Sequence, residues 1–223
     1  MPTPYTLTLK GYWRSSASWR VRIALNLKGL SYTYEPVHLV RDGGEHLKDA
    51  YLELNPMGQV PLLRVEGGEV PTGEARQLTQ SIAILDLLDH LAPTPRMLPA
   101  DPWARARVLQ LAEVINSGIQ PLQNLSVLRR VAELGGEREA WAAEFIERGL
   151  LALERMCASD TSEFLAGDAP TAADACLVPQ LYNARRFSLN LDRFPRLTAV
   201  ERRCEALEAF ERARPERQPD AAP

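Results

Sequence analysis

The segment that most constrains the fold of this chain is residues 14–29, which reads Arg-Ser-Ser-Ala-Ser-Trp-Arg-Val-Arg-Ile-Ala-Leu-Asn-Leu-Lys-Gly. Two hydroxyl residues, Ser15 and Ser16, stand just before a pattern with helical periodicity, and a short alternating segment at residues 6–9 precedes them. The first turn of a helix has unpaired backbone N–H groups and the positive end of the helix dipole. Hydroxyls there either cap the helix or help to bind an anion. The segment therefore predicts a strand followed by a helix whose start is either structural or anion-binding.

The residues after this helix predict a parallel pair of strands. Gly29 is placed to end the helix in the left-handed conformation. In residues 31–39, side chains of different polarity alternate sufficiently to predict a strand. Two strands joined by so short a crossover helix are expected to pair in parallel.

A second pair of strands is predicted from residue 62 onward. Val60-Pro61 leads into an apolar strand at residues 62–65, and Gly67-Gly68 is typical of a hairpin. Residues 69–76 contain a proline and a glycine that do not suit a central strand, so we expect a protruding turn before the returning strand near 75–78. A second serine-tipped helix then opens at Gln80-Ser81.

Composition excludes several classes of protein. A net charge of −3 gives no reason to expect a nucleic-acid partner, which calls for a basic face. No apolar segment approaches the ~20 residues of a membrane span, and the N-terminus lacks the pattern of a secretory signal. Three cysteines, Cys157, Cys176 and Cys204, are expected to be buried and reduced, and three scattered histidines predict no metal site. We expect a cytoplasmic protein.

The chain is expected to form two domains. Residues 1–91 mix strands and helices, residues 92–102 are a proline-rich linker, and residues 103–223 show helical patterns alone. Residues 170–174, Pro-Thr-Ala-Ala-Asp, form a capping box that we interpret as a folding signal. The segment after Pro215 is rich in proline and charge and is expected to be frayed.

This order of elements resembles the thioredoxin-like half of the glutathione transferases. The zeta class, the maleylacetoacetate isomerases, has the signature Ser-Ser-Cys-Ser-Trp-Arg-Val-Arg-Ile-Ala-Leu, and residues 15–25 match it except that Ala17 replaces the cysteine. Residues 118–128 and 177–180 also resemble zeta-class segments, so the resemblance spans nearly the whole chain. It implies an α/β thioredoxin-like N-terminal domain, an all-α C-terminal domain, glutathione as cofactor and a homodimer.

Glutathione has three parts that such a fold has to bind. A helix start with a hydroxyl, here Gln80-Ser81, suits the γ-glutamyl carboxylate. The backbone of Val60 suits the peptide backbone of glutathione, and the resemblance implies that Pro61 is cis. The thiol needs a hydrogen-bond donor and a positive field, which Ser15 or Ser16 at the helix start can provide.

The resemblance also assigns residues to the two ligands. Glutathione-binding positions are Ser15, Ser16, His46, Val60, Gln80, Ser81, Gln120, Asn124, Leu125 and Ser126, although His46 stands where the family often has glutamine. Positions for a dicarboxylic keto-acid substrate are Arg14, Arg20 and Arg186, because arginine binds carboxylates bidentately. Arg22 is interpreted as facing solvent or a domain interface, and the adjacent Arg185 competes with Arg186 for the substrate role.

The activity that the resemblance implies is cis–trans isomerisation of maleylacetoacetate to fumarylacetoacetate in tyrosine and phenylalanine breakdown. Ser15 and Ser16 would stabilise a glutathione thiolate that adds reversibly to the double bond. Three alternatives stay open. They are maleylpyruvate isomerisation, a general zeta-class transferase activity on small α-halo acids, and a non-catalytic assembly module built on the same fold.

Overall fold

The computed structural model describes residues 5–68, 70–71 and 74–221 of the 223-residue chain. Contacts divide the chain into two compact units. One contains the residues up to Met97 together with those from Glu208 onward, and the other is Leu98–Leu207. This division differs from the one expected from the sequence, in which residues 103–223 formed a single domain, because the last segment of the chain packs on the first unit.

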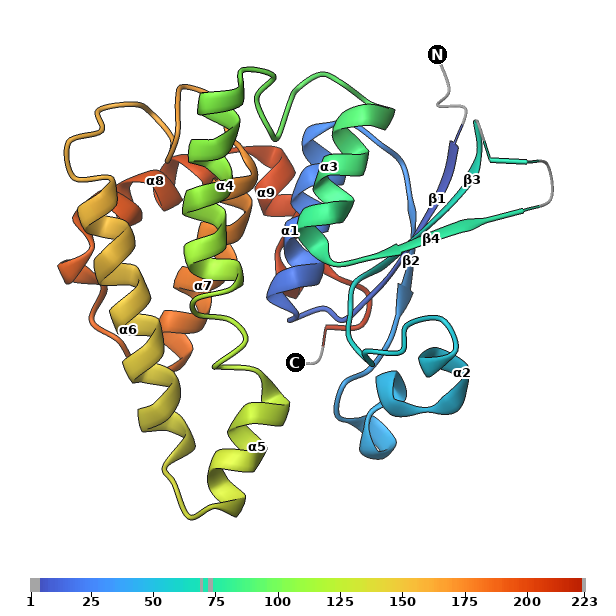
Figure 1. Ribbon diagram of the computed structural model, residues 1–223, viewed down its shortest axis with the longest axis horizontal. Coiled ribbons are helices and arrows are strands. Elements are labelled where there is room, and N and C mark those ends of the chain that lie inside the picture. The colour runs from blue at the N-terminus through green and yellow to red at the C-terminus, as the bar shows by residue number, and fades with distance from the viewer. Residues whose placement is uncertain (1–4, 69, 72–73, 222–223) are drawn as a thin grey trace. The chain divides into compact units, whose positions relative to one another are not determined.

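The first unit is a four-stranded mixed sheet with helices (Figure 1). Its strand order is β2-β1-β3-β4, with β1 parallel to β2 and antiparallel to β3, and with β3 antiparallel to β4. Helices α1 and α3 pack against each other on one side of the sheet. The elements are β1 Tyr5–Gly11, α1 Ser16–Leu27, β2 Thr33–Pro36, η1 Arg41–Gly43, η2 Glu45–Leu47, α2 Asp49–Leu52, β3 Leu62–Gly67, β4 Arg76–Thr79 and α3 Ser81–Leu91.

The predicted end of the first helix is confirmed, and two predicted strands form with changed bounds. Gly29 follows the end of α1 with a φ of 62°, a left-handed conformation that glycine adopts without a steric penalty. Strand β2 is shorter than the predicted 31–39 and ends at Pro36, which has no N–H for the ladder. The returning strand β4 lies one residue beyond its predicted position. Of the protruding turn predicted at 69–76, residues 69, 72 and 73 lie outside the described residues.

The second unit is helical. Its core is formed by fully buried side chains of α4, α6 and α7, among them Leu111, Ile146 and Cys176. The capping box at the start of α7 is confirmed, with the Thr171 N–H donating to Asp174 Oδ2 at 2.8 Å. All three cysteines are free and buried. The elements are α4 Pro102–Asn116, α5 Leu125–Glu133, α6 Arg138–Met156, α7 Ala172–Arg186, η3 Leu191–Arg193 and α8 Pro195–Glu205.

The C-terminal segment contradicts one expectation and excludes one of the two alternatives for Arg22. Helix α9 (Glu208–Ala213) packs on α1, and the turn η4 (Pro215–Arg217) follows it. The frayed tail predicted after Pro215 is wrong, because the buried Gln218 side chain donates to backbone carbonyls of this segment. Arg22 does not face solvent. It is fully buried, and its Nε donates to the carbonyl of Ala213 at 3.0 Å. The C-terminal segment thus provides a hydrogen-bond acceptor for a buried guanidinium, which would otherwise be costly to bury.

Candidate functional site

Ser15 caps the start of α1, as one of the two sequence interpretations predicted. Its Oγ accepts the N–H of Ser18 at 3.2 Å, and its own N–H donates to the carbonyl of Tyr12 at 3.0 Å. Ser16 is the first residue of the helix, and no acidic residue stands in the first turn. Because the oxygen of Ser15 serves as the cap acceptor, its hydroxyl hydrogen can still be donated to an anion held by the positive end of the helix.

The segment before β3 presents the backbone of Val60. The Val60–Pro61 peptide is cis, as the resemblance implied. Two buried side chains fix this segment, because the hydroxyl of Tyr51 and the Nδ2 of Asn55 both donate to the carbonyl of Gln59 at 2.7 Å. Burial raises the pKa of Tyr51 to about 12, so its hydroxyl keeps its proton at neutral pH. Neither Tyr51 nor Asn55 was singled out from the sequence, since their common partner is a backbone group.

The start of α3 combines unusual backbone geometry with a buried arginine. Gln80 has a φ of 69°, a conformation that residues other than glycine rarely adopt and that clusters at binding sites. Ser81 is nearly buried, and its Oγ accepts a hydrogen bond from Arg20 Nη1 at 3.0 Å. The first turn of α3 contains no acidic residue.

Arg20 therefore has a neighbour that the sequence did not indicate. The side chain is fully buried, and its Nη1 donates to the hydroxyl oxygen of Ser81. This placement does not favour the predicted contact with a substrate carboxylate. It instead puts a cation beside Ser81, where the guanidinium adds to the positive field at the start of α3 and leaves the hydroxyl hydrogen of Ser81 available to an anion.

The other predicted substrate arginines differ in their partners. Arg14 is half-buried and stacks on the ring of Trp13, with 5.1 Å between the guanidinium carbon and the ring centroid. In the second unit, Arg185 makes a bidentate ion pair with Glu201, with N–O distances of 2.6 and 2.5 Å. Arg186 lies outside that pair and donates to Asn183 Oδ1 at 3.1 Å. The ion pair with Glu201 therefore involves Arg185 and not Arg186.

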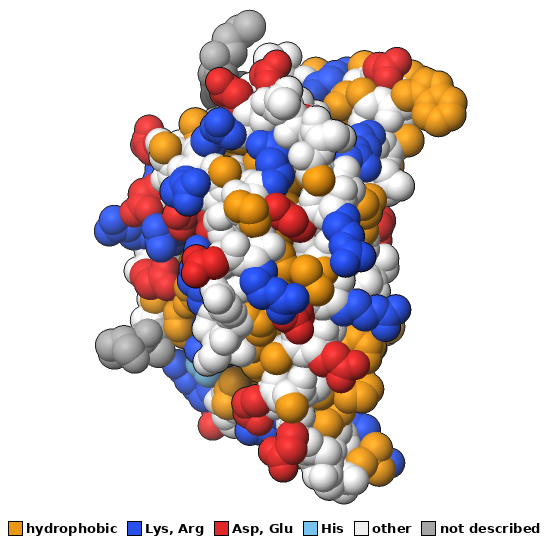
Figure 2. All heavy atoms as spheres, turned by 90° about the vertical axis from the view of Figure 1, so that its left-hand side faces the viewer, with side chains coloured by type: hydrophobic (Ala, Val, Ile, Leu, Met, Phe, Trp, Pro, Cys, Tyr) orange, Lys and Arg blue, Asp and Glu red, His pale blue; other side chains and the backbone are white. Residues whose placement is uncertain are grey.

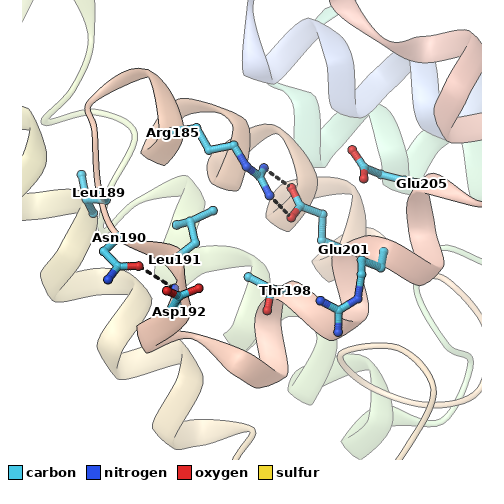
Figure 3. A pocket seen from close by; sticks show the side chains of 9 residues that line it. Arg185, Leu189, Asn190, Leu191, Asp192, Thr198, Glu201 and Glu205 are labelled. Carbon is cyan, nitrogen blue, oxygen red and sulfur yellow. Dashed lines mark hydrogen bonds and ion pairs between the residues drawn. The ribbon is translucent and has the colours of Figure 1, made fainter.

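The pair of Arg185 and Glu201 lies in a polar pocket near the ends of α7 and α8 (Figure 3). Glu201 is almost completely buried, and it raises the pKa of Arg185 by its hydrogen bonds. Of the residues considered for glutathione or substrate, only Arg185, the competitor of Arg186, is among those that line this pocket.

The remaining predicted residues lie in three places. His46 is half-buried in η2 of the first unit. Asn124 caps α5, and its Oδ1 accepts the backbone N–H and the hydroxyl of Ser126, both at 3.2 Å. Leu125 begins that helix and is exposed. The side-chain nitrogen of Gln120 is buried without a hydrogen-bond partner among the described residues, which leaves a donor for a ligand.

Other kinds of site are not apparent in the described part of the chain. Within it, no group of three His, Cys, Asp or Glu side chains is arranged to hold a metal ion, and no helix is long and apolar enough to cross a membrane. On the face drawn in Figure 2, basic and acidic side chains are interspersed, without the continuous basic surface that nucleic acids require.

Comparison with known proteins finds matches to both domains of one protein family. Residues 14–91 match the model of the glutathione S-transferase N-terminal domain, and residues 135–203 match that of the C-terminal domain. Mouse maleylacetoacetate isomerase is 43% identical over 212 residues, which are 95% of this chain and 94% of the mouse protein.

Two solved structures are similar over nearly the full length. Maleylacetoacetate isomerase from Anaeromyxobacter dehalogenans with bound GSH is 49% identical, with a TM-score of 0.88, and the match covers 99% of this chain and 100% of that one. The holo structure of a maleyl pyruvate isomerase, a bacterial zeta-class enzyme, is 42% identical with a TM-score of 0.87, over 96% and 100% of the two chains. The chain belongs to the zeta class of the glutathione S-transferase family.

Proposed function

We propose that this protein catalyses the glutathione-dependent cis–trans isomerisation of maleylacetoacetate to fumarylacetoacetate, a step of tyrosine and phenylalanine breakdown. The observation that carries the proposal is the likeness to maleylacetoacetate isomerases along the whole chain, one of them solved with bound GSH. The substrate is a dicarboxylic keto acid, and the cofactor acts as a catalyst.

The donor set of the chain fits glutathione. We assign the thiol to Ser15 and Ser16, the γ-glutamyl carboxylate to Gln80 and Ser81, and the peptide backbone to Val60. Both helix starts lack acidic residues, so their positive ends are available to the thiolate and the carboxylate. The unpartnered nitrogen of Gln120 supports the further assignment of glutathione contacts to the helical unit, with His46 adding a contact from the first unit. The contacts of the helical unit are Gln120, Asn124, Leu125 and Ser126.

Bound glutathione supplies a thiolate nucleophile for the double bond of the substrate. A free thiol has a pKa of about 8.5, so only a few per cent of it is ionised at neutral pH. The protein therefore has to lower this pKa, and each unit corresponds to about 1.4 kcal/mol. A hydrogen bond donated by Ser15 and the positive end of α1 both favour the charged form.

Binding of the substrate carboxylates is assigned to Arg14 and Arg186. Arg14 stacks on the ring of Trp13, a contact that holds the guanidinium through its face and leaves the N–H groups at its edge to bind a carboxylate. Arg185 is committed to Glu201, which supports Arg186 as the arginine of the helical unit that binds substrate. Arg20 is assigned to Ser81 instead, as a residue that supports cofactor binding.

Replacing Arg186 with lysine is expected to raise the KM for the keto acid by about three- to tenfold, because a bidentate fork becomes a point charge. The glutathione Kd is expected to stay within about twofold, since the carboxylate of the substrate is the proposed partner. Steady-state kinetics at saturating glutathione measures the KM, and calorimetric titration with glutathione measures the Kd. Arg185→Lys is the matched control. A defect in Arg185→Lys and none in Arg186→Lys would move the assignment by one residue.

Maleylpyruvate is the second candidate substrate, favoured by the likeness to a maleyl pyruvate isomerase. The two keto acids undergo the same chemistry and differ in length, so kcat/KM for each, measured on one enzyme preparation, separates them. We expect the higher kcat/KM for maleylacetoacetate. The reverse order would replace the proposed substrate while keeping the cofactor chemistry. Activity on small α-halo acids is compatible with either.

We further propose that the protein is a cytoplasmic homodimer. Three buried cysteines without a disulfide suit a reducing compartment. Trp103, on the first turn of α4, is 85% exposed, and a large apolar side chain in that position suits an interface between copies. Analytical ultracentrifugation measures the oligomeric state directly, and a monomer at micromolar concentration would contradict the dimer.

A further inference from the structure

The backbone of Trp13 is held at both of its polar groups. Its N–H donates to Asp220 Oδ2 at 3.0 Å, and its carbonyl accepts a hydrogen bond from Arg22 Nη2 at 2.8 Å. Trp13 lies inside the turn that the Ser15 N–H closes on the carbonyl of Tyr12. The position of Ser15 therefore depends on how firmly the backbone of Trp13 is fixed.

The two groups that hold Trp13 come from opposite ends of the chain. Arg22 lies on α1 and is fully buried, and burial lowers its pKa while the carboxylate of Asp220 acts against that shift. Asp220 is half-buried near the C-terminus, and its Oδ2 also accepts from the hydroxyl of Tyr34 at 3.4 Å. A carboxylate bonded to a backbone N–H is among the stronger hydrogen-bond acceptors in proteins.

Asp220 is itself held in place by the C-terminal strap, which we define as residues 214–221. The Nε2 of Gln218 donates to the carbonyl of Arg214 at 2.8 Å, which folds the strap back on itself. Ala221 packs against a hydrophobic cluster that includes both Trp13 and Val60. The strap thus contacts the turn before Ser15 and packs on the hydrophobic cluster to which Val60 belongs.

We propose that Asp220 is a positioning residue for the reaction proposed above: by accepting the N–H of Trp13, it fixes the turn that aims the Ser15 hydroxyl at the sulfur of glutathione. Asp220 does not touch the cofactor in this proposal. It acts through the backbone of Trp13, whose carbonyl is held by the buried Arg22.

The first test needs no ligand. In Asp220→Ala, amide hydrogen exchange at residues 12–16 of the free protein is expected to be about tenfold faster than in the wild type, because the Trp13 N–H loses a charged acceptor. Exchange in the second unit is expected to stay unchanged. Glu216→Ala is the matched control, since Glu216 is an exposed carboxylate of the same strap that pairs with Arg214.

The second test measures the effect of the same variant on the thiol of bound glutathione and on the reaction rate. Ultraviolet titration of the bound thiol is expected to show a pKa about one unit higher in Asp220→Ala, and kcat/KM is expected to fall by up to about tenfold at pH values below the thiol pKa. Raising the pH restores part of the rate, and the glutathione Kd stays within about threefold, because the carboxylate contacts of glutathione are untouched. Asp220→Asn keeps an oxygen that can accept the Trp13 N–H and is expected to stay within about threefold of the wild type.

These measurements separate the inference from the proposed function. Unchanged exchange at residues 12–16 or an unchanged thiol pKa in Asp220→Ala overturns the inference. If Asp220→Ala does not fold, Asp220→Leu, which keeps the approximate size of the side chain without an acceptor, decides: faster exchange at residues 12–16 with a raised thiol pKa supports the inference, and unchanged values overturn it. A wild-type protein that leaves the thiol pKa of glutathione at its ordinary value contradicts the proposed function, whereas the exchange comparison still reports on Asp220.

Discussion

Replacing Ser15 with alanine is expected to lower the rate of isomerisation at saturating glutathione by about 10²–10³-fold, because one preorganised donor to an anion commonly contributes that much. The pKa of the bound thiol is expected to rise in the same variant. Glutathione affinity is expected to stay within about tenfold, since most of the binding contacts are remote from the sulfur. Steady-state kinetics measures the rate, thiol titration the pKa, and calorimetric titration with glutathione the affinity.

The N-terminal cap at Ser15 has to be separated from its role toward the thiol. Loss of a cap costs about 1 kcal/mol of stability whatever the function of the residue. Asp101→Ala removes the cap of α4, where Asp101 Oδ1 accepts the N–H of Ala104 at 2.8 Å, and is the control for that loss. Ser16→Ala is expected to have a smaller effect than Ser15→Ala. Full activity in Ser15→Ala would contradict the assignment.

Replacing Ser81 with alanine is expected to raise the Kd for glutathione by about 10- to 100-fold, and to leave kcat at saturating cofactor nearly unchanged. The reason is the loss of one hydrogen bond to a charged group, worth about 1.5–3 kcal/mol. The variant also removes the acceptor of the buried Arg20 Nη1, which adds a cost in stability. Calorimetric titration with glutathione measures the Kd.

Ser117→Ala is a suitable control for this variant. The hydroxyl of Ser117 donates to the carbonyl of Glu113 at 2.8 Å at the exposed end of α4, so its removal tests the loss of a serine hydroxyl alone. An unchanged glutathione Kd in Ser81→Ala would place the γ-glutamyl carboxylate elsewhere on the protein.

Local sequence patterns predicted most of the fold. The start of α1 and the hairpin between β3 and β4 depend on a capping residue, glycines and short-range periodicity. The start of α7 depends on a capping box. All of these signals lie within a few residues of the element they define. The resemblance to a family added the order of the two domains.

The supporting contacts of the site could not be predicted in this way. Arg22 and Asp220 both hold Trp13 although they stand near opposite ends of the chain, and a helical pattern indicates neither partner. The C-terminal strap has the composition of a frayed tail, but the hydrogen bonds of its buried Gln218 side chain keep it folded. Arg20 likewise has the pattern of a residue on a helix face, and its contact with Ser81 becomes visible only in the folded chain.

The most direct test of the account is the dependence of isomerisation on glutathione. The purified protein is mixed with maleylacetoacetate, and fumarylacetoacetate is measured with no glutathione and with glutathione well below the substrate concentration. The account predicts negligible conversion without glutathione, and with it many turnovers per molecule of glutathione, all of which is recovered as free thiol. Isomerisation without glutathione, or consumption of one glutathione per product, would contradict it.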